Sequence, residues 1–254
     1  MRLNIVLALA VFTLLLLLNP VFAQDMNPEA GKLFNEGNSQ LEAGNYSGAI
    51  KNYQDALKIE QDYRIYYQLG IAQKKSGELE AAKNSFESCL KLKNDFEAGY
   101  NALGGVYYTM GNLAEAINNF KKVLQFADNE KTKSKVKKNL ALAYTKMGKD
   151  ELNKGNVNDA ISYFTQAVNN YNYDAAYLSL AQIYSDLGQW DQSISAAENA
   201  LKYRSSVPKG GPYYYMGLAY KGKGDIQKAK EMFNQAKSDG TYKSSAEYEL
   251  SQLN

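Results

Sequence analysis

The chain has 254 residues, and its 29 lysines and arginines against 27 aspartates and glutamates give a formal net charge of +2. This balance excludes a strongly basic nucleic-acid binder and an acidic tail protein. The chain has no histidine and one cysteine, which excludes a Ser-His-Asp triad, histidine-bearing zinc sites and an intrachain disulfide framework. Hydrophobic residues form 45% of the chain, which is enough for a packed core. We expect no catalytic residue, metal or cofactor.

Residues 1–23 have the layout of a signal peptide. Arg2 supplies the positive charge, residues 5–18 form the apolar run, and Pro20 ends it. Small residues before the cut predict cleavage after Ala23. The run is shorter than the ~20 apolar residues that a membrane-spanning helix needs. We therefore expect an exported protein, in a bacterial periplasm, with association to the cell envelope left open.

An uncleaved N-terminus and a lipidated N-terminus are the alternatives to cleavage. Uncleaved, the same segment would tether the protein to a membrane, and this alternative stays open. Lipid attachment requires a cysteine at the cleavage site, and the chain has only Cys89. Removing residues 1–23 leaves 28 basic and 27 acidic residues, because this segment holds one arginine and no acid. A nearly neutral exported protein is not expected to bind nucleic acid.

Residues of a few types recur along the rest of the chain at one period. Glycines recur 33 to 44 residues apart, at Gly44, Gly77, Gly111, Gly155, Gly188 and Gly224. A small residue lies seven positions before each glycine, at Gly37, Gly70, Gly104, Gly148, Ala181 and Gly217. Nine positions after each turn glycine (Gly44 and its equivalents) come Tyr53, Phe86, Phe120, Phe164, Ala197 and Phe233. Such self-similarity is typical of a repeat protein.

Each period predicts two amphipathic helices joined by a turn at the glycine. The turn glycine suits a left-handed position after the first helix. The small residue lets two helix backbones approach closely, and the aromatic residue fills the space beside them. Because one pair of helices cannot bury its own apolar face, the pairs must stack into a solenoid.

This pattern resembles the tetratricopeptide repeat family from about Ala30 to Lys243. The resemblance implies an all-α fold, a right-handed α-solenoid of about six helix-turn-helix repeats with a C-terminal capping helix. The repeats span residues 30–62, 63–96, 97–130, 141–173, 174–207 and 210–243, and together with the capping helix they make residues 30–254 one solenoid. Residues 24–29 form a lead-in, with Asn27 as a helix cap. Residues 131–140 are a forward extension of the first helix of the fourth repeat. Residues 244–254 are the capping helix, with Ser244 and Glu247 as a capping box. In the fifth repeat, Ser193 and Ala197 replace the usual alanine and aromatic residue, so we expect looser packing there.

The resemblance also implies a concave groove that binds a peptide or protein segment and is lined by the first helix of each repeat. Its candidate lining residues are Phe34, Asn38, Tyr67, Ile71, Lys74, Tyr108, Leu178, Tyr214 and Lys221. Tyrosine provides large contact area at low entropic cost, which suits an apolar or aromatic segment. The alternative, that these rings pack between helices, stays open. Phe34 and Gln68 stand where members that clamp a carboxylate have lysine and asparagine, so we do not expect such a clamp.

Five lysines lie close together without an acid among them, at Lys131, Lys133, Lys135, Lys137 and Lys138. They form either a docking patch for an acidic partner, anionic lipid or polyanion, or an ordinary solvated helix face. Cys89 occupies a small position of the second repeat, where we expect a buried structural thiol.

We therefore predict an exported, non-catalytic scaffold or adaptor that binds a partner protein segment in the groove. This prediction allows for a partner within a membrane-associated complex. The sequence does not specify the partner or the oligomeric state. Two alternatives remain: a membrane-tethered structural scaffold with an uncleaved N-terminus, and a glycan-binding protein on a helical scaffold.

Mass spectrometry of the mature protein tests the cleavage prediction. We expect Gln24 as the first residue, since the cut is predicted after Ala23. A mature chain that still begins at Met1 would support the membrane tether instead.

Overall fold

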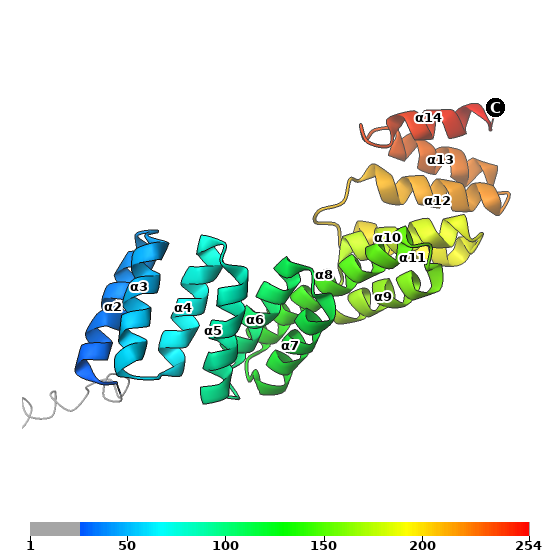
Figure 1. The fold of residues 1–254 in the computed structure, drawn as a ribbon. Coiled ribbons are helices and arrows are strands. Elements are labelled where there is room, and N and C mark those ends of the chain that lie inside the picture. Colours follow the sequence, from blue (N-terminus) through cyan, green and yellow to red (C-terminus); the bar gives the residue numbers. More distant parts are fainter. Residues whose placement is uncertain (1–25, 254) are drawn as a thin grey trace, which may run out of the picture. The chain divides into compact units, whose positions relative to one another are not determined.

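The structure is a computed structural model that describes residues 26–253. Within that part, all regular secondary structure is helical, with thirteen helices and no strands (Figure 1). Successive helices form antiparallel pairs joined by short turns, so the predicted fold class, an α-solenoid of helix-turn-helix repeats, is confirmed. The predicted signal peptide lies outside the described residues.

The chain divides into two compact units, one ending at Leu92 and the other beginning at Lys93. The first unit contains two helix pairs, α2 (Pro28–Glu42) with α3 (Tyr46–Ile59), and α4 (Tyr63–Ser76) with α5 (Leu79–Leu92). Helix α3 packs against both α2 and α4. The apolar core between these helices includes the fully buried Tyr53 and Ile65.

The second unit contains the remaining helices: α6 (Glu97–Met110), α7 (Leu113–Phe126), α8 (Glu130–Asn153), α9 (Val157–Asn170), α10 (Asp174–Asp186), α11 (Trp190–Lys202), α12 (Gly210–Gly222), α13 (Ile226–Ala236) and α14 (Lys243–Ser251). Helix α8 is 24 residues long and includes residues 131–140. Helix α14 packs against α13 at the C-terminal end (Figure 1).

The six predicted turn glycines all adopt positive φ angles, between 69° and 89°. Glycine has no Cβ and therefore enters this left-handed region without steric cost. The predicted left-handed turn after the first helix of each repeat is confirmed.

An aromatic ring lies against a glycine of the facing helix in five of the six repeats. A Cβ atom added at Gly70, for example, would lie 2.6 Å from Phe86, which is fully buried. The fifth repeat has two alanines at these positions, Ala181 in place of the glycine and Ala197 in place of the aromatic residue, and both are fully buried. Ser193 compensates in part, because its hydroxyl donates a 2.8 Å hydrogen bond to the Ala181 carbonyl.

The start of the C-terminal helix differs from the prediction. Helix α14 begins at Lys243, its cap residue is Tyr242, and no side chain makes a capping hydrogen bond. Ser244 therefore lies inside the first turn, and the predicted capping box with Glu247 is wrong. The Tyr242 ring packs 5.6 Å from the Tyr214 ring, and this tertiary contact holds the start of the helix in place of a local cap.

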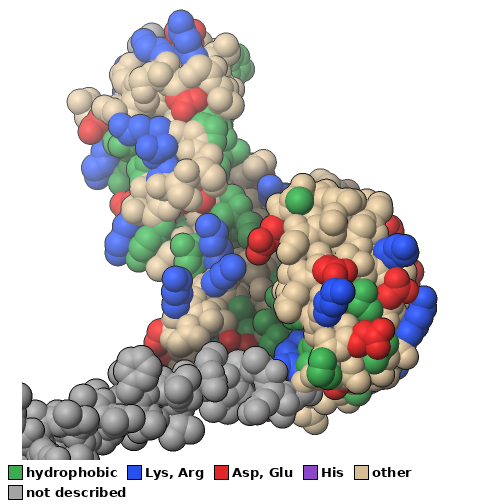
Figure 2. Space-filling view, turned by 90° about the vertical axis from the view of Figure 1, so that its left-hand side faces the viewer, with side chains coloured by type: hydrophobic (Ala, Val, Ile, Leu, Met, Phe, Trp, Pro, Cys, Tyr) green, Lys and Arg blue, Asp and Glu red, His purple; other side chains and the backbone are tan. Residues whose placement is uncertain are grey.

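On the face drawn in Figure 2, lysine and arginine side chains lie among apolar ones, and acidic side chains are scattered between them. This mixture agrees with the near-zero net charge of the chain. None of the helices in residues 26–253 is both long enough and apolar enough to cross a membrane.

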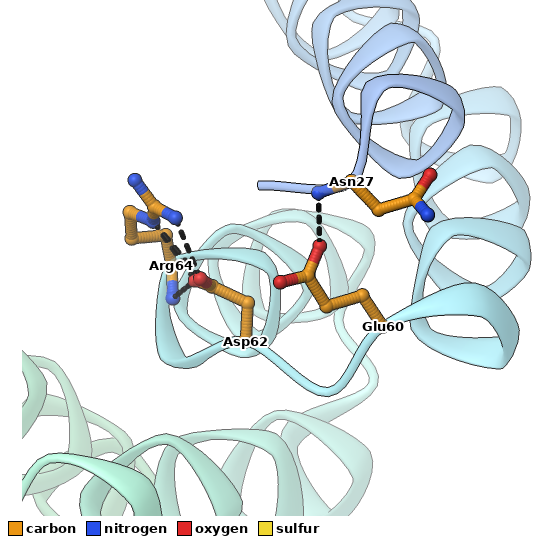
Figure 3. A network of polar contacts seen from close by, with 4 residues as sticks. All are labelled: Asn27, Glu60, Asp62 and Arg64. Atoms are coloured by element: carbon orange, nitrogen blue, oxygen red, sulfur yellow. Dashed lines mark hydrogen bonds and ion pairs between the residues drawn. The ribbon is translucent and has the colours of Figure 1, made fainter. Parts of the chain in front are cut away.

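Polar contacts hold the beginning of the first unit (Figure 3). The Asn27 side chain caps α2 by accepting from the Glu29 and Ala30 amides at 2.9 and 3.4 Å, as predicted. The Asn27 amide donates to Glu60 Oε2 at 2.6 Å, which joins the start of α2 to the α3–α4 connection. On the same connection, Asp62 caps α4 and pairs with Arg64 at 2.7 Å.

A buried carboxylate holds the loop between α11 and α12. Asp174 is fully buried, and its Oδ2 atom accepts from the backbone amides of Ser205, Ser206 and Val207 at 2.5–3.0 Å. The Ser206 hydroxyl donates to Oδ1 at 3.0 Å. Although burial acts to raise it, these hydrogen bonds lower the pKa of Asp174 to about 2.

Replacing Gly70 with alanine tests the contact between glycine and aromatic ring. We expect Gly70→Ala to lower the free energy of unfolding by about 1–3 kcal/mol, because the added methyl group overlaps a ring that has no room to move. Urea unfolding followed by circular dichroism measures the change.

Gly31→Ala on α2 is the matched control. Its Cβ would meet only the Met26 sulfur, at 3.9 Å, so the better helix propensity of alanine should leave stability unchanged or raise it by up to about 1 kcal/mol. Equal stabilities of the two variants would contradict the packing argument.

Replacing Asp174 with asparagine tests the loop anchor. A pKa of about 2 against the ordinary 3.8 corresponds to roughly 2 kcal/mol at neutral pH, and Asp174→Asn should lose about that much. The measurement is urea unfolding at pH 7 and again at pH 3.

The pH dependence has a definite sign. Because folding lowers the pKa, the stabilisation is present above the ordinary pKa and is lost as the pH falls from about 5 towards 2. The difference between wild type and variant should therefore shrink at pH 3. Asp128→Asn, at an exposed position, should change stability by less than about 0.5 kcal/mol. A constant difference across this pH range would refute the assignment.

Candidate functional site

In the first unit, the predicted groove residues lie on the first helix of each repeat, α2 and α4, which contact each other. Phe34 and Asn38 come from α2, and Tyr67, Ile71 and Lys74 come from α4. Lys74 is exposed, and the other four are half-buried. The structure therefore places these residues on neighbouring helices, partly open to solvent.

The aromatic residues at the fifth position of three repeats share one packing arrangement. Each ring lies 5.9 Å from the buried aromatic ring of its own repeat, in the pairs Phe34–Tyr53, Tyr67–Phe86 and Tyr214–Phe233. Burial raises the pKa of Tyr67 and of Tyr214. One side of each ring is thus packed against the core, and the assignment of these rings to a binding groove stays a prediction.

Asn38 is also tied to the core. Its side-chain oxygen accepts a 2.8 Å hydrogen bond from the hydroxyl of Tyr53. Burial raises the pKa of Tyr53 to about 12, so the phenol remains a donor at neutral pH.

In the second unit, the predicted groove residues lie on α6, α10 and α12. Tyr108 on α6 is half-buried, and the Lys146 ammonium lies 5.4 Å from its ring centre, within the range of a cation–π interaction. Leu178, Tyr214 and Lys221 lie on α10 and α12, which contact each other, and all three are half-buried.

A pocket of about 430 Å³ opens beside the last of these residues, and we call it the C-terminal pocket. Its walls include Asp186, Trp190, Leu218, Lys221, Gly222 and Glu249. Of these, only Lys221 was predicted as a site residue. Asp186, Trp190 and Glu249 belong to three different helices, and no repeat pattern in the sequence connects them.

The five lysines of the predicted basic patch lie in the first half of α8. Lys133 is half-buried and pairs with Glu130 at 3.0 Å, while the other four are exposed. Lys138 lies 6.0 Å from the Tyr171 ring centre. Among residues 26–253, Lys131, Lys135, Lys137 and Lys138 have no ion-pair partner, so this helix face carries unpaired positive charge, and both predicted roles, docking patch and solvated face, stay open.

The fifth repeat contains a second pocket, of about 390 Å³. It is lined by Tyr177, Leu180 and Tyr184 of α10 and by residues of α11. Helix α11 is the one that has Ala197 where the other repeats have an aromatic residue. Ser193 and Ala197 do not line it and are fully buried, so the looser packing of this repeat stays a prediction.

Residues 26–253 hold no cluster of three or more acidic or cysteine side chains able to bind a metal, and no buried polar side-chain atom in them lacks a hydrogen bond. Cys89 is buried, as predicted, and burial raises the pKa of its thiol to about 12. A thiol with this pKa stays protonated and is a poor nucleophile.

The fold and these surfaces define a helical repeat protein whose first helices present half-buried rings and lysines. Family models described as tetratricopeptide repeat match residues 63–96, 98–130, 145–202 and 212–238, together more than half of the chain. The chain belongs to the tetratricopeptide repeat family. Proteins of this family generally mediate protein–protein interactions.

Characterised relatives share the repeats over part of their length. The photosystem I assembly protein Ycf3 of Prochlorococcus marinus is 30% identical over 143 residues, which are 53% of this chain and 81% of the relative. Small glutamine-rich tetratricopeptide repeat-containing protein 2 of Saccharomyces cerevisiae is 31% identical over 43% of this chain, and heat shock protein STI1 of the same yeast is 27% identical over 42%. The matches span only 35% and 18% of these two yeast proteins.

One solved structure supports the fold. A tetratricopeptide repeat protein from Parabacteroides merdae matches with a TM-score of 0.51 at 16% identity, over 89% of this chain and 99% of that chain. At this identity the likeness concerns the fold alone.

Proposed function

We propose that this protein is an exported, non-catalytic scaffold or adaptor that binds a segment of a partner protein through the first helices of its repeats. The observation that carries the proposal is the shared packing of Phe34, Tyr67 and Tyr214, whose rings lie 5.9 Å from a buried ring and are half-buried themselves. Each ring leaves part of its surface for a ligand.

Core packing prepares these rings for binding. A ring held by the core loses little freedom when a ligand covers its open side, so more of the contact energy contributes to affinity. Stacked repeats hold such residues on adjacent helices, as α10 and α12 do for Leu178 and Tyr214. This arrangement suits an extended or helical segment with apolar side chains.

The comparisons support a role among other proteins. The relative from Prochlorococcus marinus is named for the assembly of photosystem I, and from it we carry over only the general role of assisting assembly. Export rests on the pattern of residues 1–23, and we propose a periplasmic location from that pattern.

Photo-crosslinking in the native host tests the proposal. A benzoylphenylalanine residue at position 108 preserves an aromatic ring on the first-helix face, and the same residue at exposed position 135 is the control. We expect a discrete protein adduct from position 108 alone, because only that position lies beside the proposed groove. Mass spectrometry of the adduct would identify the partner.

The variant Tyr108→Ala separates binding from folding. We expect it to weaken partner capture about tenfold while the melting temperature changes little. A matching loss of thermal stability would assign this ring to the core instead. An adduct from position 135 alone would move the site to the lysines of α8, and no adduct from either position would contradict the proposal.

A further inference from the structure

The C-terminal pocket brings together residues of two repeats and the terminal helix. Asp186 ends α10, Trp190 begins α11, Leu218 and Lys221 lie on α12, and Glu249 lies on α14. Leu218 and Lys221 lie three residues apart on the first helix of the last repeat, and Lys221 is one of the predicted groove residues. The volume of about 430 Å³ is within the range of pockets that hold a small ligand or a side chain.

The indole of Trp190, the only tryptophan of the chain, is held in the pocket wall by a glycine of the next repeat. A Cβ atom at Gly222 would lie 2.4 Å from the indole ring, so the ring lies directly against the α12 backbone. This close approach explains why Gly222 is present, although the repeat turn requires only Gly224. The ring is therefore fixed, and its remaining surface faces the pocket.

The charges in the pocket do not balance. Glu249, whose side chain is 13% exposed, pairs with Lys221 at 2.7 Å. Lys223, the next lysine on the chain, is engaged by Asp191. Within the described part of the chain, the Asp186 carboxylate has no hydrogen-bond or ion-pair partner, although partial burial raises its pKa. One negative charge therefore remains in the pocket.

The position of Asp186 in its helix is unfavourable for stability. It is the last residue of α10, and a carboxylate at the C-terminal end of a helix is repelled by the helix dipole. The residue is exposed, so water reaches the carboxylate, and partial desolvation in the pocket raises its pKa. A charged residue that costs stability and lacks a structural partner is a candidate for ligand binding.

We propose that the C-terminal pocket binds a basic side chain, arginine or lysine, of the partner segment. This inference rests on the proposed function, and it names the chemistry that the partner presents to the last repeat. The Asp186 carboxylate pairs with the incoming cation, the Trp190 ring lies beside it as a cation–π partner, and Leu218 contacts its methylene groups. The flat guanidinium of arginine suits the ring and the carboxylate together.

The single tryptophan provides the readout. The purified mature protein is titrated with the blocked pentapeptide Ala-Ala-Arg-Ala-Ala and with the same peptide carrying citrulline, the neutral isostere of arginine. Binding is followed through the one indole N–H resonance in nitrogen-15 spectra. We expect a saturable shift with the arginine peptide, and at least about fivefold weaker binding of the citrulline peptide, because only arginine forms a charge-assisted pair.

Two variants complete the experiment. Asp186→Asn should weaken binding of the arginine peptide about fivefold and leave the melting temperature unchanged or higher, because it removes a charge repelled by the helix dipole. Glu198→Gln removes an exposed acid of α11 outside the pocket and should not alter binding. Equal binding of the two peptides, equal binding by Asp186→Asn, or no shift with either peptide would overturn the inference.

These outcomes are separate from those of the crosslinking experiment. An adduct from position 108 together with a failed peptide titration would keep the binding face and reject the basic side chain. A positive titration without an adduct from position 108 would support the pocket and reject the proposed groove.

Discussion

The structure depends on one recurring contact, in which an aromatic ring of one helix packs against a glycine of the facing helix. At Gly37, Gly70, Gly104, Gly148 and Gly217, an added methyl group would lie within 2.5–2.9 Å of that ring. The contact sets how closely the two helices of a repeat approach and fixes the ring at the centre of the repeat. The fixed ring then supports the fifth-position ring of the first helix, so the geometry of the candidate binding face follows from the packing of the core.

Because of this dependence, several candidate groove residues cannot be assigned to function alone. Tyr67 and Tyr214 each contact a buried phenylalanine, and Asn38 accepts a hydrogen bond from the buried Tyr53. Lys74 is different, because it is exposed. Substituting Tyr67, Tyr214 or Asn38 therefore changes both stability and the surface offered to a partner, and only measurements that follow both quantities separate them.

The sequence predicts contacts that recur in every repeat, and it does not predict contacts that occur once. The turn glycines and the buried rings follow from periodicity, because the same residue types recur at equivalent positions of successive repeats. Asp174 binding the amides of Ser205–Val207, and Trp190 lying on Gly222, each occur at one place and leave no periodic signal. The capping box at Ser244 was wrong for a related reason, since a tertiary contact of Tyr242 sets the start of α14. Local patterns were reliable for the fold and incomplete for the site.

The terminal helix has two physical roles that explain why the C-terminal pocket differs from the rest of the face. The last repeat of a solenoid exposes an apolar side that a capping helix must cover, and Ala246 of α14 is buried beside Phe233 for this purpose. The same helix brings Glu249 to Lys221. Asp186 lines the same pocket as this ion pair. Because Glu249 engages Lys221, Asp186 is the carboxylate of the pocket that has no protein partner among the described residues, and the helix that covers the core thereby contributes to the charge that the pocket presents to a partner.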